Sequence, residues 1–313
     1  MTEAGSTFCE RSLIKKADMP PRFDLPAEVV WRADAILGEG PVWDDRTGSL
    51  YWLDIKGKQL HAYTPSNQSC RTIALSVEVG AIAPRSKGGM IAATRRGFAT
   101  LNPEDGSLAF LADPEDHLPD NRFNDGKCDT CGNFVAGSMD DREINTSGAV
   151  YHFDPGHRVS TLFEGYVVCN GPAFSIDGRI LYFSNSVDRE ILAFPYDPVL
   201  GQTGKPRVFA RIPENQGHPD GLTVDSKGYL WCAHWGGGQL TCFDPQGFVA
   251  GTIRVPVPLV TSCTFGGLDY DRLFITTARV GLSAAQLEEF PLSGSLFMAE
   301  PGVTGLPAAK FSG

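Results

Sequence analysis

A group of short strand-like segments returns six times along the 313 residues, with the same order of segments and turns each time. Copy five, for example, runs through Gly221–Asp225, Gly228–Ala233 and Gln239–Asp244, with apolar side chains alternating along each segment. The copies start near residues 40, 80, 125, 171, 221 and 263, so the period is 40 to 50 residues. Such a period, with up to four strands per unit, is typical of β-propeller blades. We therefore expect an all-β chain: a six-bladed β-propeller with four-stranded antiparallel blades around a central channel.

The first residues of the chain suggest how this ring closes. Residues 1–25 are polar and include Pro20 and Pro21, which predicts a flexible N-terminal arm, and residues 26–313 would then be a single propeller domain. The strand-like segment near Val29 is well placed to complete the blade begun at Thr261. Only Ser283–Glu288 indicates a short helical turn. An irregular β-sandwich is the alternative, and the regular phase of the repeat favours the propeller.

Composition narrows the classes of partner and compartment. The formal net charge is −10 and no Lys/Arg-rich run exists, so we expect no nucleic-acid partner. No apolar run reaches the roughly 18 residues of a membrane span, and the N-terminal residues lack the apolar core of a signal peptide. The eight cysteines lie mostly in apolar contexts typical of buried thiols, and the Cys128-x-x-Cys131 pair lacks the second pair of a zinc ribbon. These features favour a reducing, cytoplasmic setting without a membrane partner.

Three copies share a further pattern just ahead of their first strand. Gly38-Glu39-Gly40-Pro41, Cys169-Asn170-Gly171-Pro172 and Pro219-Asp220-Gly221 each place an oxygen-bearing side chain beside a glycine. Asn124 occupies the equivalent position in copy three. In a propeller the innermost strands surround the channel, so these positions would meet at one mouth. Each motif alone is typical of a turn, and their common phase is what predicts convergence.

Oxygen ligands of this kind favour a hard metal ion. Two carboxylates and an amide oxygen suit Ca²⁺, Mg²⁺ or Mn²⁺, with coordination positions left for water or substrate. Carboxylates brought together without a cation would repel one another. We therefore predict that Glu39, Asn170 and Asp220 bind one divalent metal ion.

The chain resembles the gluconolactonase/regucalcin (senescence marker protein) family of six-bladed propellers from about Ala35 to Phe297. The resemblance is carried by segments at Leu37–Trp43, Tyr51–Ile55, Asn121–Lys127, Cys169–Pro172, Pro219–Gly221 and Phe274–Arg279. It implies that Glu39, Asn170 and Asp220 are metal ligands and that Arg122 and Asn124 bind substrate. The implied cofactor is one divalent ion: Ca²⁺, Mn²⁺, Mg²⁺, Zn²⁺ or Fe²⁺. Some members carry a glutamate where this chain has Arg142. The contact that this glutamate makes in those members is therefore not expected here.

Within the family, Trp235–Gly238 and Thr276–Leu282 are most similar to bacterial sugar-acid lactonases such as xylonolactonase. The resemblance therefore implies hydrolysis of a sugar lactone to the aldonic acid, by a monomer or weak homo-oligomer. The metal would polarise the lactone carbonyl, and Asp220 could accept a proton from the attacking water. His234 fits a packed aromatic turn better than sugar contact, and His218, beside the Asp220 loop, fits a solvated loop histidine better than a residue that supports the metal ligands. Serine-based hydrolysis is disfavoured because the chain has no Gly-x-Ser-x-Gly motif.

Several alternatives stay open from sequence alone. The same site could hydrolyse aryl esters or organophosphates. Strictosidine-synthase-like chemistry occurs on the same fold, but it needs no metal triad. A calcium-binding regulatory propeller without catalysis, of the regucalcin type, is a hypothesis of another class, and a plain interaction scaffold is a further one. The particular sugar, its ring size, the metal in use and the roles of Arg142, Glu143, His218 and His234 are left undetermined.

Overall fold

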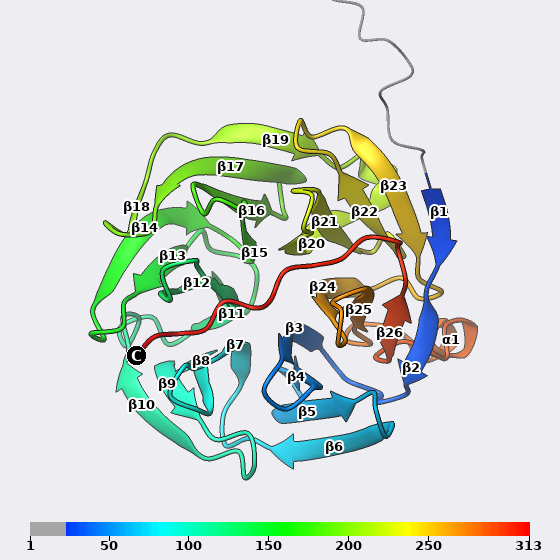
Figure 1. The fold of residues 1–313 in the computed structure, drawn as a ribbon, viewed down its shortest axis with the longest axis horizontal. Coiled ribbons are helices and arrows are strands. Elements are labelled where there is room, and N and C mark those ends of the chain that lie inside the picture. Colours follow the sequence, from blue (N-terminus) through cyan, green and yellow to red (C-terminus); the bar gives the residue numbers. More distant parts are fainter. Residues whose placement is uncertain (1–22) are drawn as a thin grey trace, which may run out of the picture.

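The computed structural model describes residues 23–313, which form six β-sheets arranged as blades around a central channel (Figure 1). Strands that follow one another in each blade pair antiparallel, and the first of them lies nearest the channel. The blades are numbered here in the order of their inner strands. This architecture confirms the six-bladed propeller predicted from the repeat.

Successive strands of each blade step outward from the channel. The inner strands of blades one to six are β3 (Gly38–Asp44), β7 (Val79–Pro84), β11 (Asn121–Cys128), β15 (Cys169–Phe174), β20 (His218–Val224) and β24 (Val260–Gly266). The second strands are β4 (Ser49–Asp54), β8 (Met90–Thr94), β12 (Phe134–Asp140), β16 (Ile180–Asn185), β21 (Leu230–Trp235) and β25 (Arg272–Thr277). The third strands are β5 (Gln59–Thr64), β9 (Gly97–Leu101), β13 (Gly148–Phe153), β17 (Glu190–Asp197), β22 (Gln239–Phe243) and β26 (Leu296–Ala299). The fourth strands are β6 (Ser69–Ala74), β10 (Leu108–Ala112), β14 (Val159–Tyr166), β19 (Arg207–Arg211), β23 (Val249–Arg254) and β2 (Glu28–Trp31).

The ring is closed by a strand from the beginning of the chain. β2 pairs antiparallel with β26, with Val29 opposite Phe297, so it completes blade six as predicted. β1 (Phe23–Pro26) pairs parallel with β23 and gives blade five a fifth strand. Residues 1–22 of the predicted N-terminal arm lie outside the described residues, whereas its last three residues belong to β1. β18 (Gln202–Thr203) adds a short edge to blade four.

Helical structure is confined to two short segments among the described residues. η2 (Glu214–Gln216) is a single 3₁₀ turn, and α1 (Ala284–Glu289) is capped by Ser283, whose side chain accepts from the backbone N–H of Gln286. The capped α1 confirms the helical turn predicted near Ser283–Glu288. Neither segment has the length and apolar character that a membrane-spanning helix requires.

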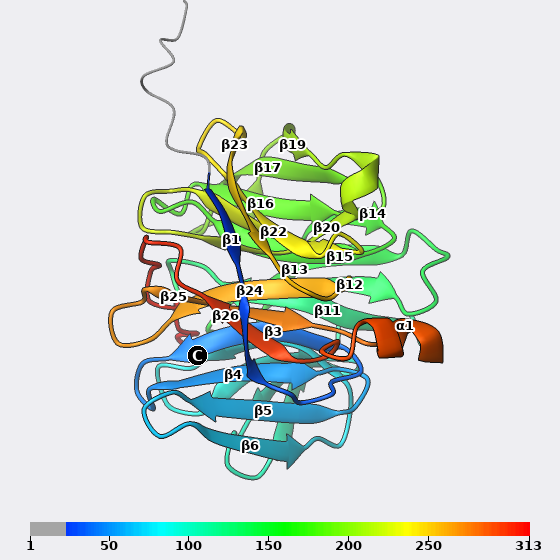
Figure 2. The same ribbon diagram turned by 90° about the vertical axis from the view of Figure 1, so that its right-hand side faces the viewer.

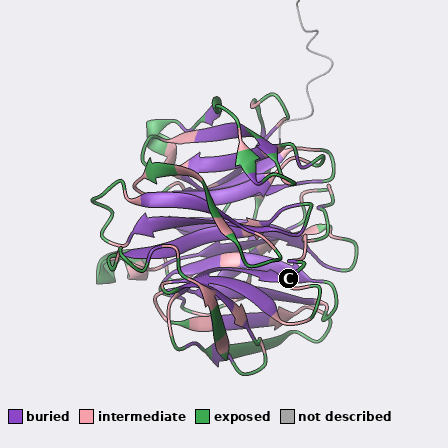
Figure 3. Cartoon of the chain, turned by 90° about the vertical axis from the view of Figure 1, so that its left-hand side faces the viewer, coloured by how far each residue is buried: buried purple, intermediate pink, exposed green. Residues whose placement is uncertain are grey.

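The core is distributed between neighbouring blades. Trp43 of blade one stacks on Phe274 of blade six, with ring centroids 6.0 Å apart. Phe98 of blade two packs on Phe123 of blade three at 4.7 Å. Figure 3 shows the buried strands in purple and the exposed loops in green. Each inner strand packs between two neighbouring blades. The positions of the residues at its ends are therefore fixed by contacts with both neighbours.

Five of the seven described cysteines are buried, and none forms a disulfide with another described cysteine. The exceptions are Cys70 and Cys131, which are exposed. The prediction of buried thiols therefore holds for most of these residues and is wrong for these two. Cys9 lies outside the described residues.

The C-terminal strap, residues 300–313, runs across one end of the channel (Figure 1). Gly305 bridges to Asp225 of blade five, and Phe311 bridges to Arg85 of blade two. Phe311 is fully buried and stacks on Phe153 of blade three at 5.5 Å. In Figure 2 the strap lies on the side of the ring opposite α1. One end of the channel is thus covered by the chain itself.

Candidate functional site

The inner strands share an irregularity close to their first residues. Each loses register against its second strand at this point, and in four blades the shift falls at Glu39/Val42, Phe123/Asp125, Asn170/Ala173 and Pro219/Leu222. Such a bulge bends the strand and redirects a side chain. Gly40 and Gly171 sit in these bulges with φ of 55° and 49°, a conformation that glycine adopts without strain. Gly40 and Gly171 therefore let the strand turn beside Glu39 and Asn170, whereas at Gly221 the close approach of Ser262 leaves no room for a side chain.

Blades two and six have the same bulge, but none of the predicted metal ligands lies in them. In blade two the position is Gly80, where an added Cβ would lie 2.3 Å from the Phe123 carbonyl oxygen, so no side chain fits. In blade six it is Thr261, whose hydroxyl donates to the Gly38 carbonyl at 2.6 Å. The polar side chains at this end of the channel therefore come mainly from blades one, three, four and five.

The predicted site residues come together in one pocket of about 370 Å³ at this end of the channel. Its walls include all five of them: Glu39, Arg122, Asn124, Asn170 and Asp220. Each is buried, with no more than 7% of its surface exposed. The common phase of the motifs thus predicted a real convergence, while the chemical roles of these residues stay predictions.

Electrostatics at the pocket favour a bound cation. Burial raises the pKa of Glu39 and Asp220 well above the ordinary carboxyl range, and their neighbouring carboxylates, including Asp125, raise it further. Asp220 Oδ1 is buried without a hydrogen-bond partner among the described residues. An unpartnered buried oxygen beside like charges is costly unless a cation or proton compensates it.

The donor set fits a hard divalent ion. Glu39 and Asp220 supply carboxylate oxygens, and Asn170 supplies an amide oxygen. Within residues 23–313 no group of three or more His, Cys, Asp and Glu side chains is arranged for metal binding, so the amide of Asn170 is needed to complete the set. Glu39 Oε2 accepts only its neighbour's backbone N–H, from Gly40 at 3.0 Å, among the described residues.

Hydrogen bonds orient the Asn170 amide toward the pocket. Asn124 Nδ2 donates to Asn170 Oδ1 at 2.5 Å, and Asn170 Nδ2 donates to Ser186 Oγ at 3.1 Å. The Ser186 hydroxyl donates in turn to the Pro219 carbonyl at 2.7 Å, which ties blade four to blade five. An amide oxygen has two lone pairs, so Asn170 Oδ1 keeps one for a metal ion.

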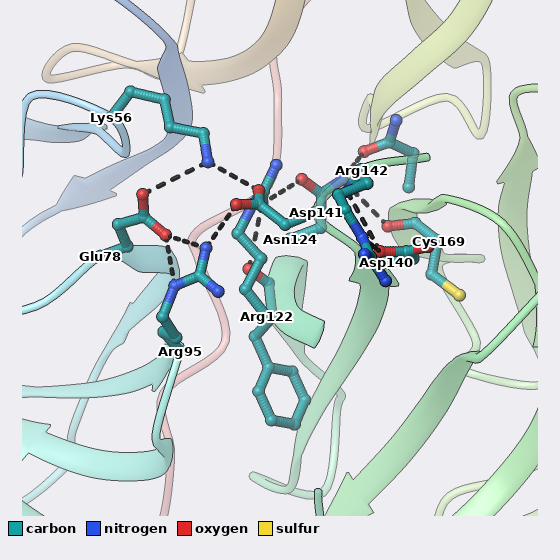
Figure 4. A network of polar contacts seen from close by, with 11 residues as sticks. Lys56, Glu78, Arg95, Arg122, Asn124, Asp140, Asp141, Arg142 and Cys169 are labelled. Carbon is teal, nitrogen blue, oxygen red and sulfur yellow. Dashed lines mark hydrogen bonds and ion pairs between the residues drawn. The ribbon is translucent and has the colours of Figure 1, made fainter. Parts of the chain in front are cut away.

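Arg122 belongs to a charged cluster formed by Lys56, Glu78, Arg95, Arg122 and Asp141 (Figure 4). Its Nε donates to Asp141 Oδ1 at 2.6 Å, and its Nη1 donates to Asn124 Oδ1 at 2.7 Å. Burial would raise the pKa of Asp141, but hydrogen bonds from Lys56 and Arg122 hold it well below its ordinary range. Asp141 is therefore a fixed negative charge that holds Arg122 against the pocket wall.

Sequence reasoning missed this cluster. Lys56, Asp141 and Glu143 line the pocket, whereas Arg142 is exposed and pairs with Asp120 at 2.7 Å. The acidic side chains that this segment brings to the pocket are thus the neighbours of Arg142 on either side. The adjacent pair Asp140-Asp141 was the one signal available, and it does not say which carboxylate faces inward.

The two histidines near the site differ in setting. His218 lines the pocket, with Nδ1 2.8 Å from the Ser186 carbonyl oxygen. His234 is fully buried, its Nδ1 lies 2.8 Å from the Gln216 carbonyl oxygen, and burial lowers its pKa to about 4. His234 is therefore a packed neutral residue, as its sequence context predicted, while Trp235 beside it reaches the pocket wall.

Comparison with known proteins places this geometry in a family. Residues 37–279 match the family described as SMP-30/Gluconolactonase/LRE-like region. Rabbit (Oryctolagus cuniculus) regucalcin is 34% identical over 296 residues, covering 92% of this chain and 99% of the relative. A Bacillus subtilis protein provisionally named a sugar lactone lactonase is 33% identical, with 91% of this chain and 99% of the relative covered.

A solved structure agrees with this placement. The calcium-binding protein regucalcin of Agrobacterium tumefaciens superimposes with a TM-score of 0.88 at 28% identity, over 93% of this chain and 99% of that chain. Regucalcins and the lactonase match at similar identity, so the comparisons support the family rather than the finer resemblance to xylonolactonase. On this match, its extent and the six-bladed fold, the chain belongs to the SMP-30/gluconolactonase/regucalcin family.

Proposed function

We propose that this protein hydrolyses a sugar-acid lactone to the aldonic acid, with one divalent metal ion held by Glu39, Asn170 and Asp220. The observation that carries the proposal is the convergence of these side chains on one pocket, where Asp220 Oδ1 is buried without a partner among the described residues. The family includes gluconolactonases by name, and one relative is provisionally named a sugar lactone lactonase. The candidate ions remain Ca²⁺, Mn²⁺, Mg²⁺, Zn²⁺ and Fe²⁺.

The bound metal ion would supply Lewis-acid polarisation of the lactone carbonyl and stabilise negative charge that develops on its oxygen. The chain's own residues supply orientation and proton transfer. Arg122 keeps its Nη2 for a substrate oxygen, because Nε and Nη1 are engaged by Asp141, Asn124 and the Phe123 carbonyl. The Asp220 carboxylate, besides holding the metal ion, would accept the proton of the attacking water.

A calcium-binding regulatory role is the second candidate. It is supported by the similarity to regucalcins, one of which is described as a calcium-binding protein. The same three ligands would serve either role, because Ca²⁺ accepts carboxylate and amide oxygens. Catalysis is what separates the two candidates.

The test is metal removal followed by metal-specific recovery. The protein is stripped with a chelator, reloaded with each candidate ion, and assayed for acid release from pentono- and hexonolactones of both ring sizes. We expect activity to vanish on stripping and to return with at least one ion. Unchanged rates after stripping would contradict the metal-dependent mechanism. Tight calcium binding without lactone opening under any ion would favour the regulatory role.

A further inference from the structure

The charged cluster extends the pocket wall away from the metal ligands. A continuous chain of hydrogen bonds leads from Asn170 to Asn124 at 2.5 Å and on to Arg122 at 2.7 Å. It continues to Asp141 at 2.6 Å and ends at Lys56, again at 2.6 Å (Figure 4). Lys56, Arg122 and Asp141 all line the pocket. A lactone whose carbonyl lies at Glu39, Asn170 and Asp220 therefore presents its far end to this part of the wall.

Hydrogen-bond capacity on this wall is mostly donor capacity. The Lys56 ammonium has three N–H groups, of which two bond to Glu78 and Asp141, and the third has no partner among the described residues. Arg122 Nη2 likewise has no partner within residues 23–313. Asp141, in contrast, already accepts from Lys56, Arg95 and Arg122. A group bound here meets N–H donors and little acceptor capacity.

The cluster also carries an excess positive charge. Within ion-pair distance, Lys56, Arg95 and Arg122 meet only Glu78 and Asp141 among the described residues, which leaves one positive charge in a chain of formal net charge −10. Glu143, the other acidic group of this segment on the pocket, adds to the repulsion at Asp220 on the metal side. The wall formed by Lys56 and Arg122 is thus locally suited to an anion.

We propose that the substrate is an acidic lactone, with a carboxylate at the end remote from its ester carbonyl, and that Lys56 and Arg122 Nη2 bind this carboxylate. The inference rests on the proposed lactone hydrolysis and names its substrate class. A carboxylate has only acceptor sites and a negative charge, which match both properties of the wall. A terminal hydroxyl would match them less well, because its O–H needs an acceptor in turn.

Lys56 is the member of the cluster that can be changed without leaving an unpaired buried charge. If its ammonium is removed, Glu78 keeps Arg95, and Asp141 keeps both Arg95 and Arg122. Lys58 provides a matched control, because it lies two residues further along the same turn, is exposed and does not line the pocket. Lys56→Met and Lys58→Met therefore remove the same charge from neighbouring positions.

The experiment compares two lactones that differ only at the far end: the monolactone of an aldaric acid and the matching aldonolactone. With the metal-loaded wild type we expect kcat/KM to favour the acidic lactone by about 10-fold or more, the size of a charge-assisted hydrogen bond. Lys56→Met should reduce that preference by about 10-fold, mainly through KM, and Lys56→Arg should restore most of it. Lys58→Met should keep it. Calorimetric titration with the open-chain aldarate and aldonate measures the same preference without turnover.

Different results would overturn the acidic-substrate inference and the lactone hydrolysis on which it rests. Equal use of both lactones, or an equal loss on both in Lys56→Met, would overturn the acidic-substrate inference and leave lactone hydrolysis standing. If neither lactone opens with any metal ion, lactone hydrolysis fails. In that case tighter binding of aldarate than aldonate, lost in Lys56→Met, would still support carboxylate recognition by this wall.

Discussion

The two ends of the central channel are formed by the same inner strands, but their chemistry differs. At the end with the proposed metal site, called the metal end, Glu39, Asn170 and Asp220 lie near the starts of the strands around a pocket of about 370 Å³. At the strapped end the later residues of these strands, such as Val42 and Leu222, line a smaller cavity of about 140 Å³. Strap residues 306–309 complete that cavity. Position along the inner strand thus decides which of the two cavities a residue lines.

Two opposite charges, Asp125 and the partly buried Lys127, lie between the two ends. Asp125 accepts the backbone N–H of Gly171 at 2.8 Å and holds the bulge beside Asn170. Lys127, two residues later, donates to the Leu222 carbonyl at 2.7 Å and lines the strapped cavity. The attraction of each charge for the other offsets part of the cost of burying them. We infer that the metal end is built for binding and the strapped end for stability, and the following predictions test that division.

The largest expected effect is at the strapped end. Phe311→Ala removes a fully buried ring stacked on Phe153, so the free energy of unfolding should fall by about 3–5 kcal/mol. Metal affinity should change little if the strap serves stability alone. Urea unfolding and metal titration of the same variant measure the two quantities. A loss of metal affinity without a loss of stability would break the proposed division.

The next effect is at the metal end. Asp220→Asn should lower metal affinity and kcat/KM by about 100-fold or more, because even changes to groups behind a ligand cost 10–100-fold. Stability of the metal-free protein should stay the same or rise, since one of several mutually repelling buried carboxylates is removed. Metal analysis, kinetics and thermal unfolding of the stripped protein are the measurements. Full activity with bound metal would remove Asp220 from the proton-accepting role.

A smaller expected effect is the loss of folding stability at acidic pH. His234, behind the metal end, and His61, packed on Trp52, both have a pKa lowered to about 4 by burial. The unfolded chain binds protons near pH 6.5, so stability is complete above that pH and falls as the pH drops toward 4. At pH 5, each buried histidine should lower the free energy of unfolding by about 2 kcal/mol relative to neutral pH.

Urea unfolding at pH 7 and pH 5 tests this contribution at the metal end. His234→Gln should unfold with a smaller difference between the two pH values than the wild type does. If the difference between the unfolding free energies at pH 7 and pH 5 is unchanged in this variant, the groups that destabilise the protein in acid lie elsewhere in the ring. His61, which lies in blade one away from both ends, supplies the comparison position for a second variant.

Much of the fold and half of the site could be predicted because they follow the repeat. The inner strands recur in one phase, so Glu39, Asn170 and Asp220 could be related to one another without any knowledge of their distance. The closing role of the strand at Val29 followed from counting strands in the last blade. In these cases the sequence contains the same motif several times, so one ambiguous copy does not change the prediction.

The rest of the site has no such repetition. Lys56 meets Asp141 across 85 residues through one side-chain contact, and neither residue belongs to a repeated motif. The strap follows the last blade and has no strand pattern, so its path could not be read from alternation. Arg142 and Asp141 are neighbours in sequence, and only the bend after β12 decides which of them faces the pocket.

The pairing of β2 with β26 also has a consequence for how the chain folds during synthesis. Apart from β1 at the edge of blade five, blades one to five pair strands that are close in sequence, whereas blade six needs a strand made near the start and another that ends at Ala299. Such distant pairing is slow, because the entropy of closing a long loop is lost before the contact forms. The ring therefore closes only after nearly the whole chain has left the ribosome. Until then the edges of β2 and β25 are exposed to pairing with other chains, and the channel mouth with the proposed metal site forms last.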